Sequence, residues 1–186
     1  MRTAIIGNSG SGKTTLARTL ANGLSIPTLD LDTIYWEPGK VAVERPAPAR
    51  LADLHAFCSR HPSWIVEGCY ADLIEAALPW RPKLILLNPG LDACVGNCKR
   101  RPFEPQKYRS KAEQDRGLGF LLKWVEDYYE RKGPMSLEWH LELFRRYDGP
   151  KRQLTTLTGV LENRTSGRCD LENVRRAGLG GDSQAT

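Results

Sequence analysis

Short apolar runs alternate with stretches of helical periodicity along this chain. A short, mostly apolar run between turn signals is typical of a strand buried in a sheet. The last of five such runs is more polar than the others, so it is expected at an edge of the sheet. The predicted strands are residues 3–6, 26–32, 64–68, 83–88 and 152–157.

The stretches between these runs place apolar side chains three or four residues apart, as amphipathic helices do. Leu16, Leu20 and Leu24 recur at this spacing, and Gly23 is expected to end that helix. The predicted helices are residues 12–22, 49–60, 71–78, 118–131 and 136–148. Strands that alternate with helices predict an α/β fold of three layers, a parallel sheet with helices on both faces.

The sequence GNSGSGKTT follows the first predicted strand, and it contains the pattern G-x-x-x-x-G-K-[ST] from Gly7 to Thr14. Glycines let successive N–H groups turn toward phosphate oxygens, and the next helix adds its positive dipole end. Lys13 is expected to reach the β- and γ-phosphates and Thr14 to ligate Mg²⁺, so the pattern predicts binding of Mg²⁺ and ATP. The predicted nucleotide contacts are Gly7, Asn8, Ser9, Gly10, Ser11, Gly12, Lys13, Thr14 and Thr15.

The rest of the chain narrows the class of phosphate-binding protein. It has no N-K-x-D motif to read a guanine base, and no apolar strand that ends in adjacent acids as in large ATPases. A short chain without these elements favours a small phosphotransferase, which positions two substrates and neutralises charge. Asp30 and Asp32 end the second predicted strand, where alternation would turn both toward the loop. One is expected to hold Mg²⁺ through water, and the other to orient or deprotonate an acceptor hydroxyl.

Three segments together resemble a known family: the loop, LDLDTIYWEPG and WIVEGCY. Over roughly residues 1–155 the chain is similar to the small adenylate-kinase-like P-loop proteins often labelled DNA topology modulation proteins. The spacing between its G-K-T-T and D-x-D motifs is also similar to that of shikimate and gluconate kinases. The resemblance implies a nucleoside-monophosphate-kinase-like core with strand order 2-3-1-4-5, a hinged acceptor-binding region and a basic lid.

The same resemblance assigns roles to individual acids. Asp30 falls where a Mg²⁺-linked carboxylate is found, and Asp32 where an acceptor hydroxyl is bound. Glu67 follows the residues WIV of the third predicted strand, where shikimate kinases place a glycine-rich acceptor-binding turn. Only Gly68 of this turn is a glycine, which argues against shikimate as the acceptor. Glu67 is either a second general base, an acceptor contact or a capping carboxylate.

A basic block follows the fourth predicted strand, at the place where the family carries its lid, about residues 98–115. Arg100 and Arg101 are expected to close over the phosphates, because an arginine fork spreads charge over the transferred phosphoryl group. An ordinary solvated basic face is the alternative interpretation of this block. By its position, Arg152 is expected to stack on adenine.

The formal net charge of +5 and a pI near 9.0 suit an anionic ligand or a nucleic acid. The leading hypothesis is therefore an ATP-dependent kinase, a phosphotransferase with Lys13, Asp32, Arg100 and Arg101 as its catalytic residues. Its acceptor would be an unidentified small molecule or nucleotide. The alternative is an ATP-dependent regulatory protein that binds nucleic acid without phosphorylating anything, although no nucleic-acid-binding motif supports it.

Other features of the sequence concern the extent of the domain, the location of the protein and the roles of its cysteines and histidines. One domain is expected at residues 1–158, followed by a loose tail at 159–186 that is poor in large apolar residues. No apolar run approaches the ~18 residues of a membrane span, and the N-terminus lacks a signal-peptide pattern, so a cytoplasmic protein is expected. The five cysteines do not show metal-site spacing; Cys94 and Cys98 are expected to be buried, and the histidines to have surface or packing roles.

Overall fold

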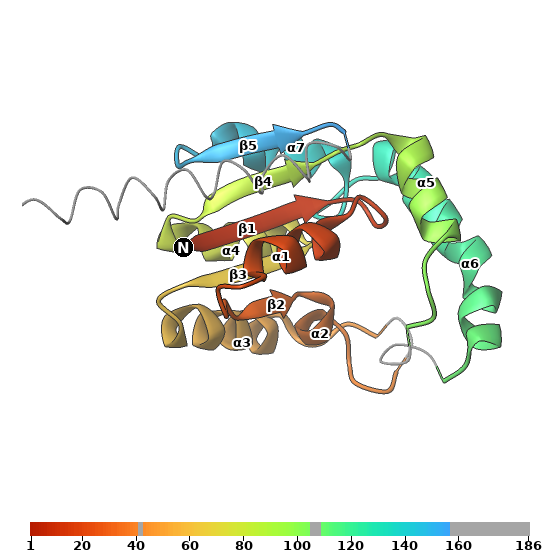
Figure 1. Ribbon diagram of the computed structural model, residues 1–186, viewed down its shortest axis with the longest axis horizontal. Coiled ribbons are helices and arrows are strands. Elements are labelled where there is room, and N and C mark those ends of the chain that lie inside the picture. Colours follow the sequence, from red (N-terminus) through yellow and green to blue (C-terminus); the bar gives the residue numbers. More distant parts are fainter. Residues whose placement is uncertain (41–42, 105–108, 157–186) are drawn as a thin grey trace, which may run out of the picture.

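The computed structural model describes residues 1–40, 43–104 and 109–156. Within these ranges, five parallel strands form one sheet in the order β2-β3-β1-β4-β5. The predicted order and the predicted parallel direction are therefore confirmed, with β1 at the centre of the sheet (Figure 1). The strands are β1 (Arg2–Gly7), β2 (Thr28–Asp30), β3 (Trp64–Gly68), β4 (Lys83–Leu87) and β5 (Lys151–Leu154).

Helices connect the strands and cover both faces of the sheet, as predicted (Figure 1). The α-helices are α1 (Lys13–Ala21), α2 (Asp32–Tyr35), α3 (Ala47–Arg60), α4 (Ala71–Ala77), α5 (Leu91–Lys99), α6 (Lys111–Glu126) and α7 (Leu137–Arg146). Two short 3₁₀ helices extend α4 and α6, η1 (Leu78–Trp80) and η2 (Asp127–Tyr129).

The core has two parts, one on each face of the sheet. Neighbouring residues of β1 point to opposite faces, as the two-residue period of a strand requires. Ile6 packs on the side of α3, α4 and α7, together with Leu54 and Leu143. Ile5 packs on the other side against Leu16 of α1. Both isoleucines are fully buried, so the central strand anchors both layers.

The start of α6 differs from the prediction, which placed it at residue 118. The helix begins at Lys111, because the sequence before it forms a helix cap. The Ser110 hydroxyl accepts the Glu113 N–H at 3.2 Å, and the Glu113 carboxylate accepts the Arg109 N–H at 2.7 Å. A serine followed three residues later by a glutamate is the sequence signature of a capping box, although here the glutamate carboxylate accepts the N–H one residue before the cap.

Helices α5 and α6 pack on each other beyond the carboxyl ends of the strands (Figure 1). Cys94 and Cys98 of α5 are buried against Val125 of α6, so the prediction that both cysteines are packed is confirmed. The predicted tail at residues 159–186 lies outside the described residues. In the described part of the chain, no helix has both the length and the apolar character needed to cross a bilayer.

Candidate functional site

The loop predicted to bind phosphate lies between the end of β1 and the start of α1. Gly10 and Gly12 have φ angles of +75° and +98°, a conformation that residues with a Cβ rarely adopt. Gly10 also lies against α5, because a Cβ at this position would stand 2.4 Å from the Cys94 carbonyl oxygen. The backbone path of the loop therefore requires both glycines.

Two asparagine side chains hold this loop in its conformation. Asn8 is only 2% exposed, and its Nδ2 donates to the Val125 carbonyl at the end of α6, at 2.9 Å. Its Oδ1 accepts the Ser9 N–H at 2.8 Å. From α5, Asn97 Nδ2 donates to the Gly10 carbonyl at 2.8 Å. The loop is thus tied to both helices that stand beyond the edge of the sheet.

The two reactive side chains of the loop have partners inside the protein. Lys13 Nζ donates to the Asn8 carbonyl at 2.9 Å, so its ammonium curls over the loop. Thr14 Oγ1 donates to Glu67 Oε1 at 2.6 Å, and Glu67 is buried at the end of β3. Strand β3 pairs directly with β1, with Glu67 opposite Ile5, and this pairing brings the carboxylate to the loop.

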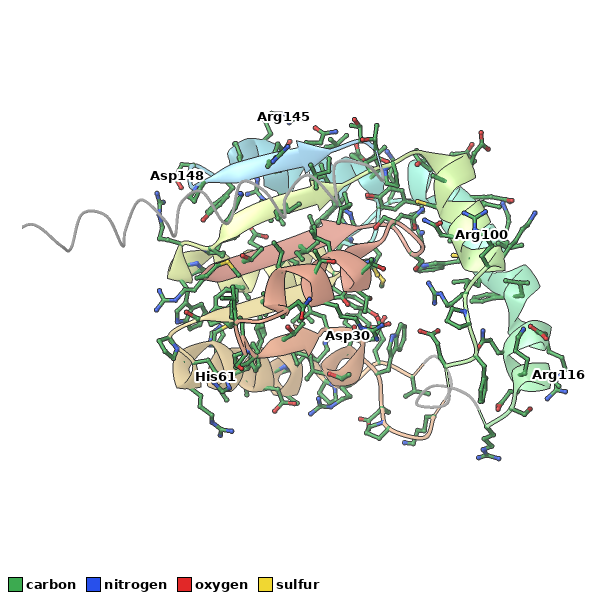
Figure 2. The ribbon with its side chains drawn as sticks, in the orientation of Figure 1. Asp30, His61, Arg100, Arg116, Arg145 and Asp148 are labelled. Atoms are coloured by element: carbon green, nitrogen blue, oxygen red, sulfur yellow. The ribbon has the colours of Figure 1, made fainter. Side chains whose placement is uncertain are left out.

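Asp30 and Asp32 lie near this carboxylate, but the prediction that one strand carries both is wrong. Strand β2 ends at Asp30, and Asp32 is the first residue of α2. Asp30 stabilises the turn between them, because its Oδ1 accepts the Asp32 N–H at 3.0 Å. Asp30 (Figure 2) is paired in register with Glu67, so the two side chains leave the same face of the sheet on adjacent strands.

A chain of aromatic residues, of which Tyr35 and Tyr70 are buried, holds the carboxylate of Asp32. The Tyr70 hydroxyl donates to Asp32 Oδ1 at 2.6 Å and accepts from Trp36 Nε1 at 2.8 Å. The Tyr35 ring stacks on the Tyr70 ring with their centroids 3.9 Å apart. Burial is the main cause that raises the pKa of Tyr70 well above its ordinary value, so the phenol keeps its proton and remains a donor. The orientation of Asp32 is therefore fixed by the protein.

The two arginines of the predicted lid have different surroundings. Arg100 is exposed at the end of α5 (Figure 2), and its Nη2 donates to Asn97 Oδ1 at 3.0 Å. Because Asn97 also holds the Gly10 carbonyl, Arg100 is connected to the loop through one side chain. Arg101 instead forms a local ion pair with Glu104 at 3.3 Å. Residues 105–108 of the predicted lid lie outside the described residues.

The other predicted nucleotide contact, Arg152, is half-buried in the edge strand β5, in register with Ile85 of β4. It is the second residue of that strand, whose carboxyl end, Leu154, pairs with Leu87. Contact between Arg152 and adenine remains a prediction.

His140 of α7 organises the turn after β3, although no spacing in the sequence marked it for this role. It is fully buried, and its Nε2 lies 2.9 Å from the Cys69 carbonyl oxygen and 3.2 Å from that of Pro134. Carbonyl oxygens only accept, so Nε2 carries the proton, and Nδ1 accepts from the Tyr128 hydroxyl at 2.8 Å. Burial lowers the pKa of His140 from its ordinary 6.5 to about 4, so this neutral tautomer persists near neutral pH.

Sequence reasoning also missed Asn97, Tyr70 and Arg131. Tyr70 ends the segment WIVEGCY but was given no role, Asn97 lies in no motif, and their partners lie 38 and 87 residues away in the sequence. Arg131 follows η2 and stacks on the Trp124 ring, with its guanidinium carbon 3.6 Å from the ring centroid. The available signal was position alone, because Tyr70 follows β3, Asn97 lies in the last turn of α5 and Arg131 comes shortly after η2.

Comparison with known proteins supports the fold. No protein-family model and no curated protein sequence matches this chain. Among solved structures, it is similar to a shikimate kinase from Bacteroides thetaiotaomicron, with 17% identity, a TM-score of 0.52, and coverage of 92% of this chain and 98% of that one. It is also similar to a sugar kinase from a Janibacter species, with 15% identity, a TM-score of 0.50, and coverage of 89% and 92%. The chain thus has the fold of these P-loop kinases.

Because His140 is buried with a lowered pKa, we expect the stability of the protein to depend on pH. Its folded-state pKa lies below its unfolded value, so the unfolded chain binds more protons between pH 6.5 and 4. The free energy of unfolding should therefore fall as the pH is lowered through this window, by roughly 3 kcal/mol for the full shift. Urea denaturation at a series of pH values measures this change.

The matched variants are His140→Gln and His55→Gln, the latter at an exposed imidazole. His140→Gln should remove the contribution of this residue to the slope, whereas His55→Gln should preserve the wild-type slope. An equal slope in the wild type and in His140→Gln would contradict this assignment.

Proposed function

We propose that this protein is an ATP-dependent kinase that transfers the γ-phosphoryl group to a hydroxyl or phosphate group of a small molecule or nucleotide. One observation carries the proposal. The phosphate loop at the end of β1 lies beside Glu67 of β3, and Asp30 and Asp32 occupy the same edge of the sheet. A phosphate-binding loop and acceptor-facing carboxylates at one edge are what a phosphotransferase requires. The catalytic unit is proposed to span residues 1–158.

The residues of the loop fit ATP. Three groups offer hydrogen bonds or charge to phosphate oxygens: the backbone N–H groups of the loop, the N-terminus of α1 and the Lys13 ammonium. The Ser11 hydroxyl is buried in the loop without a hydrogen-bond partner among the described residues, which leaves a donor that an anion can satisfy. In this proposal Lys13 exchanges the Asn8 carbonyl for a phosphate oxygen when the nucleotide binds.

The residues also fit Mg²⁺, which prefers hard oxygen ligands and keeps several of its waters. Thr14 and Glu67 bring a hydroxyl and a carboxylate within 2.6 Å of each other, and Asp30 stands on the adjacent strand. When bound, the metal ion would neutralise charge on the phosphates. Glu67 thereby joins Thr14 and Asp30 as a proposed metal-binding residue.

On the acceptor side, Asp32 is proposed to orient the attacking hydroxyl and to take its proton. Tyr70 and Trp36 set its orientation through the two hydrogen bonds described above, so the carboxylate needs no rearrangement when the acceptor binds. Arg100 and Arg101 are proposed to spread the charge of the transferred group, Arg100 from the end of α5 beside the loop.

The structure gives less support to the alternative of a nucleic-acid-binding regulator. Within the described part of the basic block, Arg101 is paired with Glu104 and Lys111 with Asp115. Paired cations release fewer counterions on binding a phosphate backbone than free ones. The kinase is therefore the function that we propose.

Product formation tests this proposal. ADP release from Mg·ATP should rise strongly with one member of a panel of nucleoside monophosphates, sugar acids, shikimate and other hydroxyl compounds. Lys13→Ala should lower nucleotide affinity at least about tenfold, because it removes a charge-assisted contact to phosphate. Lys83→Ala, at the opposite end of the sheet, is the matched control and should leave both measurements unchanged. A flat panel despite tight ATP binding would refute the kinase and turn attention to nucleic acid.

The metal assignment predicts that Glu67 and Asp30 both contribute to the gain in nucleotide affinity that Mg²⁺ provides. Calorimetric binding of a non-hydrolysable ATP analogue, with and without Mg²⁺, gives the gain in affinity that the metal provides. Glu67→Gln should reduce this gain by about tenfold, since it removes a charge next to Thr14 but keeps an oxygen for the threonine hydroxyl. Asp30→Asn is the companion variant. A loss confined to Asp30→Asn would remove Glu67 from the metal site.

The aromatic support of Asp32 predicts a selective loss of turnover. Tyr70→Phe should lower kcat for the acceptor by about tenfold, because Asp32 loses the donor that orients it, while nucleotide affinity stays unchanged. Asp32→Asn should cost more than Tyr70→Phe, and the double variant should be no worse than Asp32→Asn alone. Independent, multiplicative losses in the double variant would show that Tyr70 does not act through Asp32.

A further inference from the structure

A buried network of hydrogen bonds leads from the phosphate loop to the turn after β3. Asn8 Nδ2 donates at 2.9 Å to the carbonyl of Val125, which lies in the last turn of α6. Three residues later, in η2, the Tyr128 hydroxyl donates to His140 Nδ1 at 2.8 Å. His140 Nε2 in turn donates to the Cys69 carbonyl at 2.9 Å. The network therefore joins the loop to the end of α6, to α7 and to the turn after β3.

The far end of this network reaches the carboxylate of Asp32. Cys69 directly precedes Tyr70, and the Tyr70 hydroxyl donates to Asp32 Oδ1 at 2.6 Å. Because His140 fixes the Cys69 carbonyl, it also fixes the backbone from which the Tyr70 side chain extends. One end of the network is thus the loop proposed to hold ATP, and the other end is the carboxylate proposed to activate the acceptor.

The network is shielded from water along its whole length. Burial raises the pKa of Tyr128 above its ordinary value, so the hydroxyl keeps its proton and stays a donor to His140. Each bond that is lost would leave a buried polar group without a partner, so such a network fixes the elements that it joins. The polar side chains of the network are each at most 2% exposed; they are Asn8, Tyr70, Tyr128 and His140.

A second and shorter connection between the loop and the acceptor side runs through Glu67. Thr14 donates to Glu67, and Glu67 is paired in register with Asp30. Asp30 in turn accepts the Asp32 N–H. In the proposed function this connection is interrupted, because Thr14 exchanges Glu67 for Mg²⁺. The network through Tyr128 has no such exchange, so it is the connection that persists during transfer.

We propose that Asn8, Tyr128 and His140 are positioning residues of the transfer reaction, which hold the phosphate loop and Asp32 in a fixed relation to each other. The inference rests on the proposed function, because that function gives the two ends of the network their roles. Its consequence is a coupling between the two ends. A nucleotide that orders the loop also orders the turn that orients Asp32, and the two reacting groups are thereby aligned.

Hydrogen exchange at the Ala71 amide tests this proposal without an identified acceptor. The Ala71 N–H donates to the Pro134 carbonyl at 2.9 Å, and His140 Nε2 contacts the same oxygen at 3.2 Å, so this amide reports on the turn. The probe is a non-hydrolysable ATP analogue with Mg²⁺, added to saturation. In the wild type the analogue should slow exchange at Ala71 by at least about fivefold.

The test variant is Tyr128→Phe, which removes one hydroxyl from the network and keeps the ring. Tyr129→Phe is the matched control, because the Tyr129 hydroxyl donates to Asn88 at 3.2 Å, outside the network. Tyr128→Phe should bind the analogue but lose the slowing at Ala71, whereas Tyr129→Phe should retain it. Asn8→Ser, also saturated with analogue, interrupts the network at the loop and is the second variant if Tyr128→Phe fails to fold. The thermal midpoint of each variant reports its integrity.

Turnover gives a second readout with the acceptor that the panel of compounds identifies. Tyr128→Phe should lower kcat by about tenfold and leave the KM for ATP unchanged, because the substrates bind but are misaligned. The double variant with Tyr70→Phe should be no worse than Tyr70→Phe alone, since both residues act on Asp32 along one path. Independent, multiplicative losses would show that Tyr128 does not act along this path.

Equal slowing at Ala71 in the wild type and in a folded Tyr128→Phe variant would overturn the inference. The absence of slowing in a wild type that binds the analogue would overturn it as well. Both results leave the proposed function standing, because nucleotide binding persists. If the wild type binds no analogue, the proposed function fails and this inference fails with it, so the binding measurement distinguishes the two failures.

Discussion

The pairing of β1 between β3 and β4 is the constraint on which the rest of this structure depends. It buries Ile5 and Ile6 in opposite core layers, and it ends β1 at Gly7, where the loop begins. Because β3 is the direct neighbour of β1, Glu67 reaches Thr14, and because β2 pairs with β3, Asp30 reaches Glu67. A shift of one residue in this register would turn Glu67 to the other face and separate the carboxylate from the loop.

Hydrogen bonds within the protein organise the site. Asn8 and Asn97 fix the loop from α6 and α5, His140 holds the turn after β3, and Tyr70 holds Asp32. Lys13 and Thr14, in contrast, form hydrogen bonds to the Asn8 carbonyl and to Glu67, and contacts to phosphate and metal can replace these bonds. Because the loop and the acids are held by the protein, and only the contacts of Lys13 and Thr14 must change, little reorganisation is needed when the phosphoryl group is transferred.

Local features of the sequence predicted most of the fold and the loop. The strands and the glycine-lysine-threonine pattern can each be recognised from a few consecutive residues. The strand order followed from the family resemblance. The predictions were wrong or incomplete where an element is very short, or where the contacting residues lie far apart in the sequence. Helix α2 has four residues, too few for a helical period to show, so Asp32 was placed on a strand. The Thr14–Glu67, Tyr70–Asp32 and Asn97–Gly10 contacts join residues from different elements, and the sequence contains no pattern that relates them.

We propose that this loop and these carboxylates bind Mg²⁺ and ATP together, and a crystal structure with Mg²⁺ and a non-hydrolysable ATP analogue is the decisive experiment. The triphosphate should lie on the N–H groups of the loop, with Lys13 released from the Asn8 carbonyl. Thr14 is expected to leave Glu67 for the metal ion. If saturating analogue leaves no nucleotide at the loop, and Lys13 and Thr14 keep their present partners, the proposed binding of Mg²⁺ and ATP is wrong.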